Sequence, residues 1–361
     1  MIASIEVCNR GPLRETSRSS CSRPIPDAAS PTSPHFASKW RAVKRSVECV
    51  LTAERMKLII DKTSVADPAE VTSAIETPVG RMENTPDKGL QRADGTCRIV
   101  VGGSAKGTRI MDLYQESPIR VLFPRTGDDH VQEAVLVNTS GGVAGGDSLE
   151  SSVTALAGAS IAVTTQAAER IYRALDQSAR INTKLNVGNA AKLAWLPQET
   201  IVFNHARFCR RTEIELSPGS ELLALECLVL GRAARGETLS SGAIIDSWQV
   251  RKNGRLQWAD TLRLTDEVFS QLSRKALLWD ATALATLLYF GPDLKERLEL
   301  IRDESVSCDC QCGATLVGEM LVARLAARSS FELRAALRNL LHELGKELAP
   351  GPFQVPRMWS C

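Results

Sequence analysis

Apolar and polar side chains alternate along much of the middle of the chain. In ARINTKLNVG, residues 179–188, the odd positions from Ile181 to Val187 are mainly apolar, and the even positions from Arg180 to Asn186 are polar or charged. This period of two is typical of a half-buried strand. Comparable segments are EAVLVNT, SIAVTT, TIVFN, TEIELS, ELLALECLVLG and RLQWADTLRL. The pattern predicts a layered, mainly β body of many short strands, built as a sandwich, a barrel or a β-solenoid.

The period changes in the C-terminal third, where helices are predicted. ALLWDATALATLL and LKERLELI fit short helices, and GEMLVARLAARSSFELRAALRNLLHELGKEL fits one long helix or two in series. In the last stretch, leucines from Leu333 to Leu344 fall on one face, opposite Arg and Glu side chains. The final residues, PFQVPRMWSC, are too apolar for a solvated tail, so they either pack on their own domain or dock a partner.

The N-terminal part differs from the rest in composition. Residues 1–37 are rich in Ser, Pro and Arg and contain few apolar residues. Burial of so few apolar side chains does not offset the entropy cost of ordering the segment. We expect residues 1–95 to form a poorly ordered extension, or to lie upstream of the true start, with Met56 and Met82 as in-frame alternatives. Residues 96–361 are expected to hold the β body and the C-terminal helices.

Charge and cysteine usage narrow the function classes. The 361 residues carry a formal net charge of +2, which argues against nucleic acid or an anionic membrane as the main partner. No apolar run is long enough for a membrane span, and no signal-peptide core is present. The ten cysteines form no disulfide framework, which indicates free thiols in the cytoplasm. The four histidines have no metal-site spacing.

The glycine-rich stretch NTSGGVAGGDSLE, residues 138–150, raises the question of nucleotide binding. A phosphate-binding loop needs Lys and Ser or Thr after its last glycine, but Gly146 is followed by Asp147. The spacing also fails the dinucleotide fingerprint, and the next residues are β-prone. The stretch is therefore predicted to be a tight turn between strands that fixes the position of Asp147.

Three predicted strands carry a carboxylate on a face that is otherwise apolar, at Glu226, Asp246 and Asp260. A buried ionised carboxylate costs several kcal/mol unless it is paired or binds a cation. One explanation is pairing with arginine, and the arginines that are near in sequence are Arg232, Arg235 and Arg263. The other is a water-filled path for a divalent ion lined by oxygen ligands.

Two further acids and a thiol cluster are candidates for metal chemistry. Glu199 in LPQET and Glu237 in ARGE lie beside turn-forming residues. The stretch CDCQC places Cys308, Cys310 and Cys312 within five residues, and thiolates bind nickel, copper(I) and zinc. No second cysteine pair completes a zinc site, so the cluster is interpreted as exposed and incidental, with a metal store as the alternative.

Several separate blocks resemble one known family. In order, they are SGGVAGGDSL, TTQAAERIYRA, AWLPQETIVFNHA, LGRAARGE, WADTLRL and PRMW, between Pro118 and Trp359. Together they are similar to the UreD family, also called UreH, of urease accessory proteins. The family commonly has a lysine in its TTQAA region, where this chain has Glu169 and Arg170. The first 95 residues lie largely outside the resemblance.

The resemblance implies a β-helical body and a role that is not enzymatic. Members of this family are nickel-insertion chaperones, which bind the urease apoprotein together with UreF and the GTPase UreG. No tightly bound cofactor is implied, only transient Ni²⁺. Interior acids would line the route of the ion, and the acids in matching motifs are Asp147, Glu199, Glu226, Glu237 and Asp260.

Two functional questions stay open at the level of sequence. A β-solenoid carbohydrate enzyme could use Asp246 with Asp260, or Glu226, as its acid pair. Such enzymes bind sugars on exposed aromatic residues, and aromatic residues are only 5% of this chain. The C-terminal helices and the PRMW end are the expected docking surface for UreF.

Overall fold

A computed structural model describes residues 91–124, 131–272, 274, 277–306, 310–348 and 351–360. All of them belong to one compact unit of the chain. Almost all of the predicted N-terminal extension, including Met56 and Met82, lies outside the described residues. The first strand of the described residues begins at Asp94, two residues before the predicted start of the β body.

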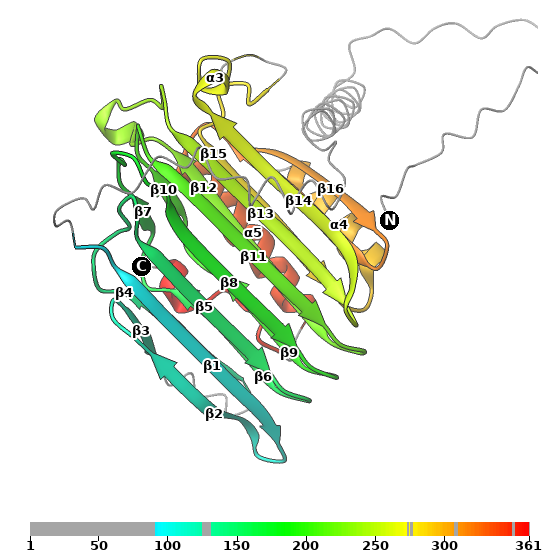
Figure 1. The fold of residues 1–361 in the computed structure, drawn as a ribbon. Helices are drawn as coiled ribbons and strands as arrows, with labels where there is room; N and C mark the ends of the chain where they lie inside the picture. Colours follow the sequence, from blue (N-terminus) through cyan, green and yellow to red (C-terminus); the bar gives the residue numbers. More distant parts are fainter. Residues whose placement is uncertain are drawn as a thin grey trace, which may run out of the picture. The chain divides into compact units, whose positions relative to one another are not determined.

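Two β-sheets form the body (Figure 1). The seven-stranded sheet has the order β14 (Arg255–Thr265), β13 (Ala243–Lys252), β11 (Arg207–Leu216), β8 (Ala179–Val187), β5 (Ser148–Ala155), β1 (Asp94–Ser104) and β2 (Gly107–Gln115). The ten-stranded sheet has the order β16 (Gln311–Val317), β17 (Met320–Ala327), β15 (Ala283–Phe290), β12 (Glu221–Leu230), β9 (Lys192–Leu196), β6 (Ser160–Thr165), β4 (Gln132–Asn138) and β3 (Ile119–Leu122), with β10 (Thr200–Val202) and β7 (Glu169–Ile171) beside it.

The chain winds from one sheet to the other and back, which makes the body a solenoid. Strands β5, β8, β11 and β13 stack in parallel in one sheet, and β4, β6, β9 and β12 do so in the other. About four coils result, closed at their ends by antiparallel strands. Of the three architectures that the strand pattern allowed, the β-solenoid is the one observed, as the family resemblance implied.

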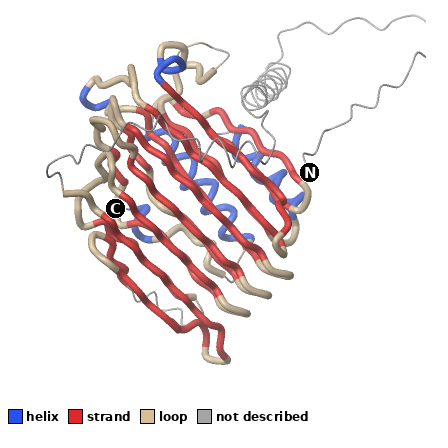
Figure 2. The backbone as a smooth tube through the Cα atoms, viewed as in Figure 1, coloured by secondary structure: helices blue, strands red, loops and turns tan. Residues whose placement is uncertain are grey.

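Two apolar cores flank the ten-stranded sheet. In β12, Leu222, Ala224 and Leu228 face the seven-stranded sheet, and Leu223, Leu225 and Cys227 face the helices. Helices α4 (Leu294–Val306) and α5 (Ser330–Glu347) lie on the outer side of this sheet (Figure 2). The described helices also include α3 (Asp266–Phe269), and none is long and apolar enough to cross a membrane.

Two of the predicted helical segments are strands. The second half of ALLWDATALATLL forms most of β15, and the first part of the long predicted helix forms β17, which leaves Ser330–Glu347 as a single helix. Both strands are buried on their two faces, one toward each core, so their apolar residues do not alternate. A continuous apolar run of this kind cannot be told from a buried helix by its period. The prediction for LKERLELI is confirmed by α4.

The C-terminal segment packs on its own domain. Phe353 is 0% and Trp359 is 1% exposed. The Trp359 indole Nε1 donates to the carbonyl oxygen of Leu196 at 3.0 Å, and Gln198 Nε2 donates to the carbonyl oxygen of Met358 at 2.7 Å. This decides between the two alternatives for PFQVPRMWSC and leaves Trp359 unavailable as a docking residue.

Glu133 on β4 is expected to make stability depend on pH. Its side chain is buried, and its Oε1 has no hydrogen-bond partner among the described residues. Burial raises the pKa of this carboxyl, against the influence of Arg357. The folded chain therefore holds the proton more tightly than the unfolded chain, and this stabilisation is lost as pH rises through the folded-state pKa.

Glu133→Gln should remove that contribution, because the amide does not ionise. Denaturant unfolding between about pH 4 and pH 8 should give a smaller loss of stability with rising pH for the variant than for the parent. Equal pH dependence for the two chains would contradict this assignment.

Candidate functional site

Polar side chains from both sheets meet in the inner core and form what we call the polar seam. The strand register aligns Arg210 with Asp246 in one sheet and Glu226 with Thr286 and Arg324 in the other. The seam consists of Arg210 (β11), Asp246 (β13), Asp260 (β14), Glu226 (β12), Thr286 (β15) and Arg324 (β17). Each occupies an inward position of its strand, between the sheets. The two-residue period of the sequence predicted this for Glu226, Asp246 and Asp260.

Arg210 holds the centre of the seam and is 2% exposed. Its Nε and Nη2 donate to the two oxygens of Asp246 at 2.9 and 2.7 Å. Its Nη1 donates to Glu226 Oε2 at 2.5 Å and to Thr200 Oγ1 at 3.1 Å. The other Glu226 oxygen accepts a hydrogen bond from Trp195 Nε1 at 2.9 Å. Glu226 and Asp246 are thus paired with arginine, but their partner is Arg210 and not Arg232, Arg235 or Arg263.

Burial and charge oppose each other at this centre. Burial raises the pKa of the Glu226 carboxyl, and the Asp246 carboxylate adds to the rise, while Arg210 and Trp195 act against it. Burial alone would lower the pKa of the Arg210 guanidinium, but Asp246 and Glu226 more than offset this, so that pKa is raised. Arg210 therefore stays charged and needs both acids as partners.

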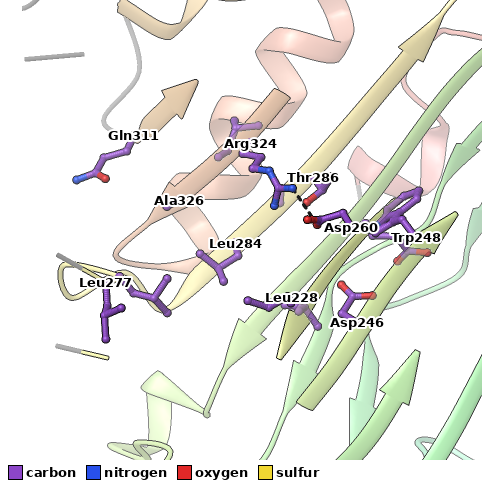
Figure 3. A pocket seen from close by; sticks show the side chains of 15 residues that line it. Leu228, Asp246, Trp248, Asp260, Leu277, Leu284, Thr286, Gln311, Arg324 and Ala326 are labelled. Atoms are coloured by element: carbon purple, nitrogen blue, oxygen red, sulfur yellow. Dashed lines mark ion pairs between the residues drawn. The ribbon is translucent and has the colours of Figure 1, made fainter. Parts of the chain in front are cut away.

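A second ion pair lies farther along the seam. Arg324 Nη2 is 2.8 Å from Asp260 Oδ2, and their side chains are 20% and 10% exposed (Figure 3). With all five groups ionised, the carboxylates of Glu226, Asp246 and Asp260 exceed the two guanidiniums by one negative charge. In that state of ionisation, the seam as a whole attracts cations.

Two cavities meet at Glu226. The Asp260 cavity, about 80 Å³, is lined by Glu226, Asp246, Asp260 and Arg324 among leucines (Figure 3). The Glu169 cavity, about 310 Å³, is lined by Arg210 and Glu226 and also by Glu169. Glu226 lines both cavities, whereas Arg210 lines only the second and Asp246 only the first. The Arg210 ion pairs therefore form the partition between the cavities.

The Glu169 cavity opens to the surface beside the glycine-rich turn. Its lining residues Gly141, Ala167 and Arg170 are exposed, whereas Arg210 and Glu226 at its other end are buried. The Glu169 carboxylate accepts hydrogen bonds from Asn138 Nδ2 at 3.0 Å and from the Arg170 backbone N–H at 3.1 Å. Burial raises the pKa of Glu169 despite these contacts.

Asp147 lies outside the seam, at the end of the predicted tight glycine turn, and its carboxylate bonds to backbone groups there. Gly141, Gly142 and Gly146 have φ values of 74°, 150° and 91°, which favour glycine. The two Asp147 oxygens accept hydrogen bonds from the backbone N–H groups of Ala93 at 2.9 Å and Ala144 at 2.7 Å. Asp147 thus ties the turn to the start of β1.

Glu199 and Glu237 also have arginine partners away from the seam. Glu199 lies 2.9 Å from Arg334 of α5, whose Nη2 also donates to the carbonyl oxygen of Trp359 at 3.1 Å. Glu237 accepts two hydrogen bonds of 2.8 Å from Arg232 in a surface loop. Of the five acids predicted for the ion route, the structure brings only Glu226 and Asp260 into the seam, together with Asp246.

The described residues, those of the seam included, form no ready-made metal-binding cluster. No group of three or more His, Cys, Asp or Glu side chains there could hold a metal ion. Cys308 lies outside the described residues. Cys310 is half-buried and Cys312 is buried, so the expectation of an exposed thiol cluster is wrong for these two.

Similarity to known proteins covers most of the chain. The family of the UreD urease accessory protein matches residues 93–360. Urease accessory protein UreD of Rhizobium etli is 41% identical over 270 residues, which cover 75% of this chain and 96% of the relative. UreD 2 of Methylorubrum populi is 44% identical over 71% of this chain and 88% of the relative. UreD 3 of Methylorubrum extorquens is 39% identical over 82% of this chain and 100% of the relative. With this family match over residues 93–360 and relatives about 40% identical over most of its length, the chain belongs to the UreD urease accessory proteins.

Proposed function

We propose that this protein is a chaperone that guides Ni²⁺ to the urease apoprotein, in a cytoplasmic complex with UreF and UreG. The observation that carries the proposal is the polar seam, in which two cavities share Glu226 deep inside a β-solenoid. An ion entering beside Glu169 would meet carboxylates at Glu226 and Asp246 and then at Asp260. Oxygen ligands of this kind bind divalent ions without the retention expected of thiolates.

The chemistry of the seam suits transfer better than storage. Each carboxylate already has an arginine partner, so a metal ion must compete with a guanidinium for it. This competition lowers the affinity for the ion and allows its release. The sequence contains no phosphate-binding loop, so we assign nucleotide hydrolysis to UreG.

The proposal gives the predicted acids different roles. Glu226 and Asp260 contact the ion, together with Asp246. Asp147, Glu199 and Glu237 support the structure around the route, since each binds backbone groups or an arginine outside the seam. No tightly bound cofactor is needed for this role.

The geometry gives little support to the carbohydrate-enzyme alternative. A glycosidase acid must donate a proton to the leaving oxygen while a second carboxylate attacks or activates water. Glu226 and Asp246 instead share the Arg210 guanidinium. We expect no turnover on a panel of glycans, and hydrolysis of any of them would revive this alternative.

Asp260→Asn is expected to lower the nickel content of urease roughly tenfold, because it removes one carboxylate from the route but keeps its shape. Glu237→Gln is the matched control, since Glu237 also pairs with an arginine but lies outside both cavities. Urease coexpressed with each variant and with UreF and UreG should be purified and its nickel measured by mass spectrometry. Equal nickel contents with both variants, while the accessory complex still copurifies, would refute the proposed route.

A further inference from the structure

Arg210 stands where an ion passing between the two cavities would have to pass. It belongs to neither end of the seam, and its guanidinium bonds to Asp246 on one side and Glu226 on the other. Arg210 lines the Glu169 cavity and its partner Asp246 lines the Asp260 cavity, so the guanidinium lies between the two cavities. An arginine at this point is unexpected in a cation path, since it repels the cargo.

We propose that Arg210 is a tethered counter-ion that the passing metal ion displaces from between Glu226 and Asp246. The inference rests on the proposed function and adds to it the residue that keeps the path from retaining the ion. In the resting protein the guanidinium forms ion pairs with both carboxylates. As the ion arrives, the Arg210 side chain moves toward the Glu169 cavity, and it returns when the ion leaves.

Charge balance favours this exchange. The two carboxylates carry two negative charges when ionised, and the guanidinium balances one of them, whereas a divalent ion balances both. An unbalanced charge in a buried site is costly, so the metal ion can compete with arginine there. The guanidinium remains attached to the chain, however, so it competes again at once and limits how long the ion stays.

The cavities provide the room for this movement. The Glu169 cavity, which Arg210 already lines, has a volume of about 310 Å³. This is far larger than the roughly 30 Å³ that one water molecule occupies. Thr200 Oγ1, at 3.1 Å from Arg210 Nη1, lines the same cavity and offers an acceptor on that side.

The test is nickel binding by the purified chain with nickel chloride alone. Arg210→Gln removes the competing charge and leaves both carboxylates, so it should bind Ni²⁺ at least tenfold more tightly than the parent. It should also retain about one ion per chain after desalting. The double variant R210Q/E226Q should lose this gain. Arg232→Gln is the matched control, because it removes an arginine from an ion pair outside the seam and should gain no nickel.

Folding is monitored because R210Q leaves two carboxylates unpaired in the core. The triple variant R210Q/E226Q/D246N, with amides in place of all three charged groups, should fold without metal and bind none. If R210Q is unfolded without metal, nickel should restore its circular dichroism spectrum and cooperative melting. A folded R210Q without the new site, or an unfolded R210Q that nickel does not restore while the triple variant folds, overturns the inference.

Urease nickel content separates this inference from the function on which it rests. With R210Q, urease should receive less nickel, because the chain keeps the ion. If D260N lowers urease nickel but R210Q gains no site, the counter-ion role fails and the proposed function stands. If R210Q retains nickel and urease is still fully loaded, the ion does not pass this point, and both are overturned.

Discussion

Trp359→Ala is expected to destabilise the protein by about 3–5 kcal/mol, as for other fully buried aromatic residues. Trp359 lies in the core between the ten-stranded sheet and α5, and it is 1% exposed. The substitution would leave a cavity there, and it would remove the donor to the Leu196 carbonyl oxygen. The Arg334 guanidinium, which lies 5.5 Å from the indole centroid, would lose that contact as well.

Phe331→Ala provides the control for this substitution. Phe331 lies in the first turn of α5 with 81% of its surface exposed, so its removal should change stability by no more than about 0.5 kcal/mol. Urea unfolding of both variants measures the difference. Equal stabilities would show that the C-terminal segment is not packed as described. A chain truncated before Pro350 would lack Phe353 and Trp359 of the second core. It would therefore be destabilised, and a loss of UreF binding by that chain would not identify a docking surface.

The faces of the strands were predictable because burial on one side imposes a period of two. This pattern placed Glu226, Asp246 and Asp260 in the interior, and all three are there. The arginine partners of these acids were not predicted, because the stacking of the coils determines which residues meet. Arg210 is 16 residues from Glu226 and 36 residues from Asp246 in the sequence. A signal for Arg210 did exist, since it shares an inward face with Phe208 and Ile214 in β11.

The helical predictions failed for a related reason. The pattern of a strand is visible only if one of its faces is polar, and β15 and β17 have apolar residues on both. The second core, which buries their outer faces, is formed by α4, α5 and the C-terminal segment. That packing depends on contacts distant in sequence, which periodicity does not report.

The central claim, that nickel travels through the interior, can be tested by closing the path without changing any charge. Ala168 lines the Glu169 cavity near its opening. Ala168→Trp would fill part of that space and leave Arg210 and the three seam acids intact. Ala157→Trp makes the same change at an exposed turn between β5 and β6 that lines neither cavity.

The decisive measurement is the number of nickel ions per urease active site after activation with each tryptophan variant, using complexes shown to contain UreF and UreG. Our account expects urease activated with the Ala168→Trp variant to lack most of its nickel, and urease activated with the Ala157→Trp variant to be loaded like that of the parent. Full nickel loading with the Ala168→Trp variant in an intact complex would show that the ion takes another path, and would contradict the account.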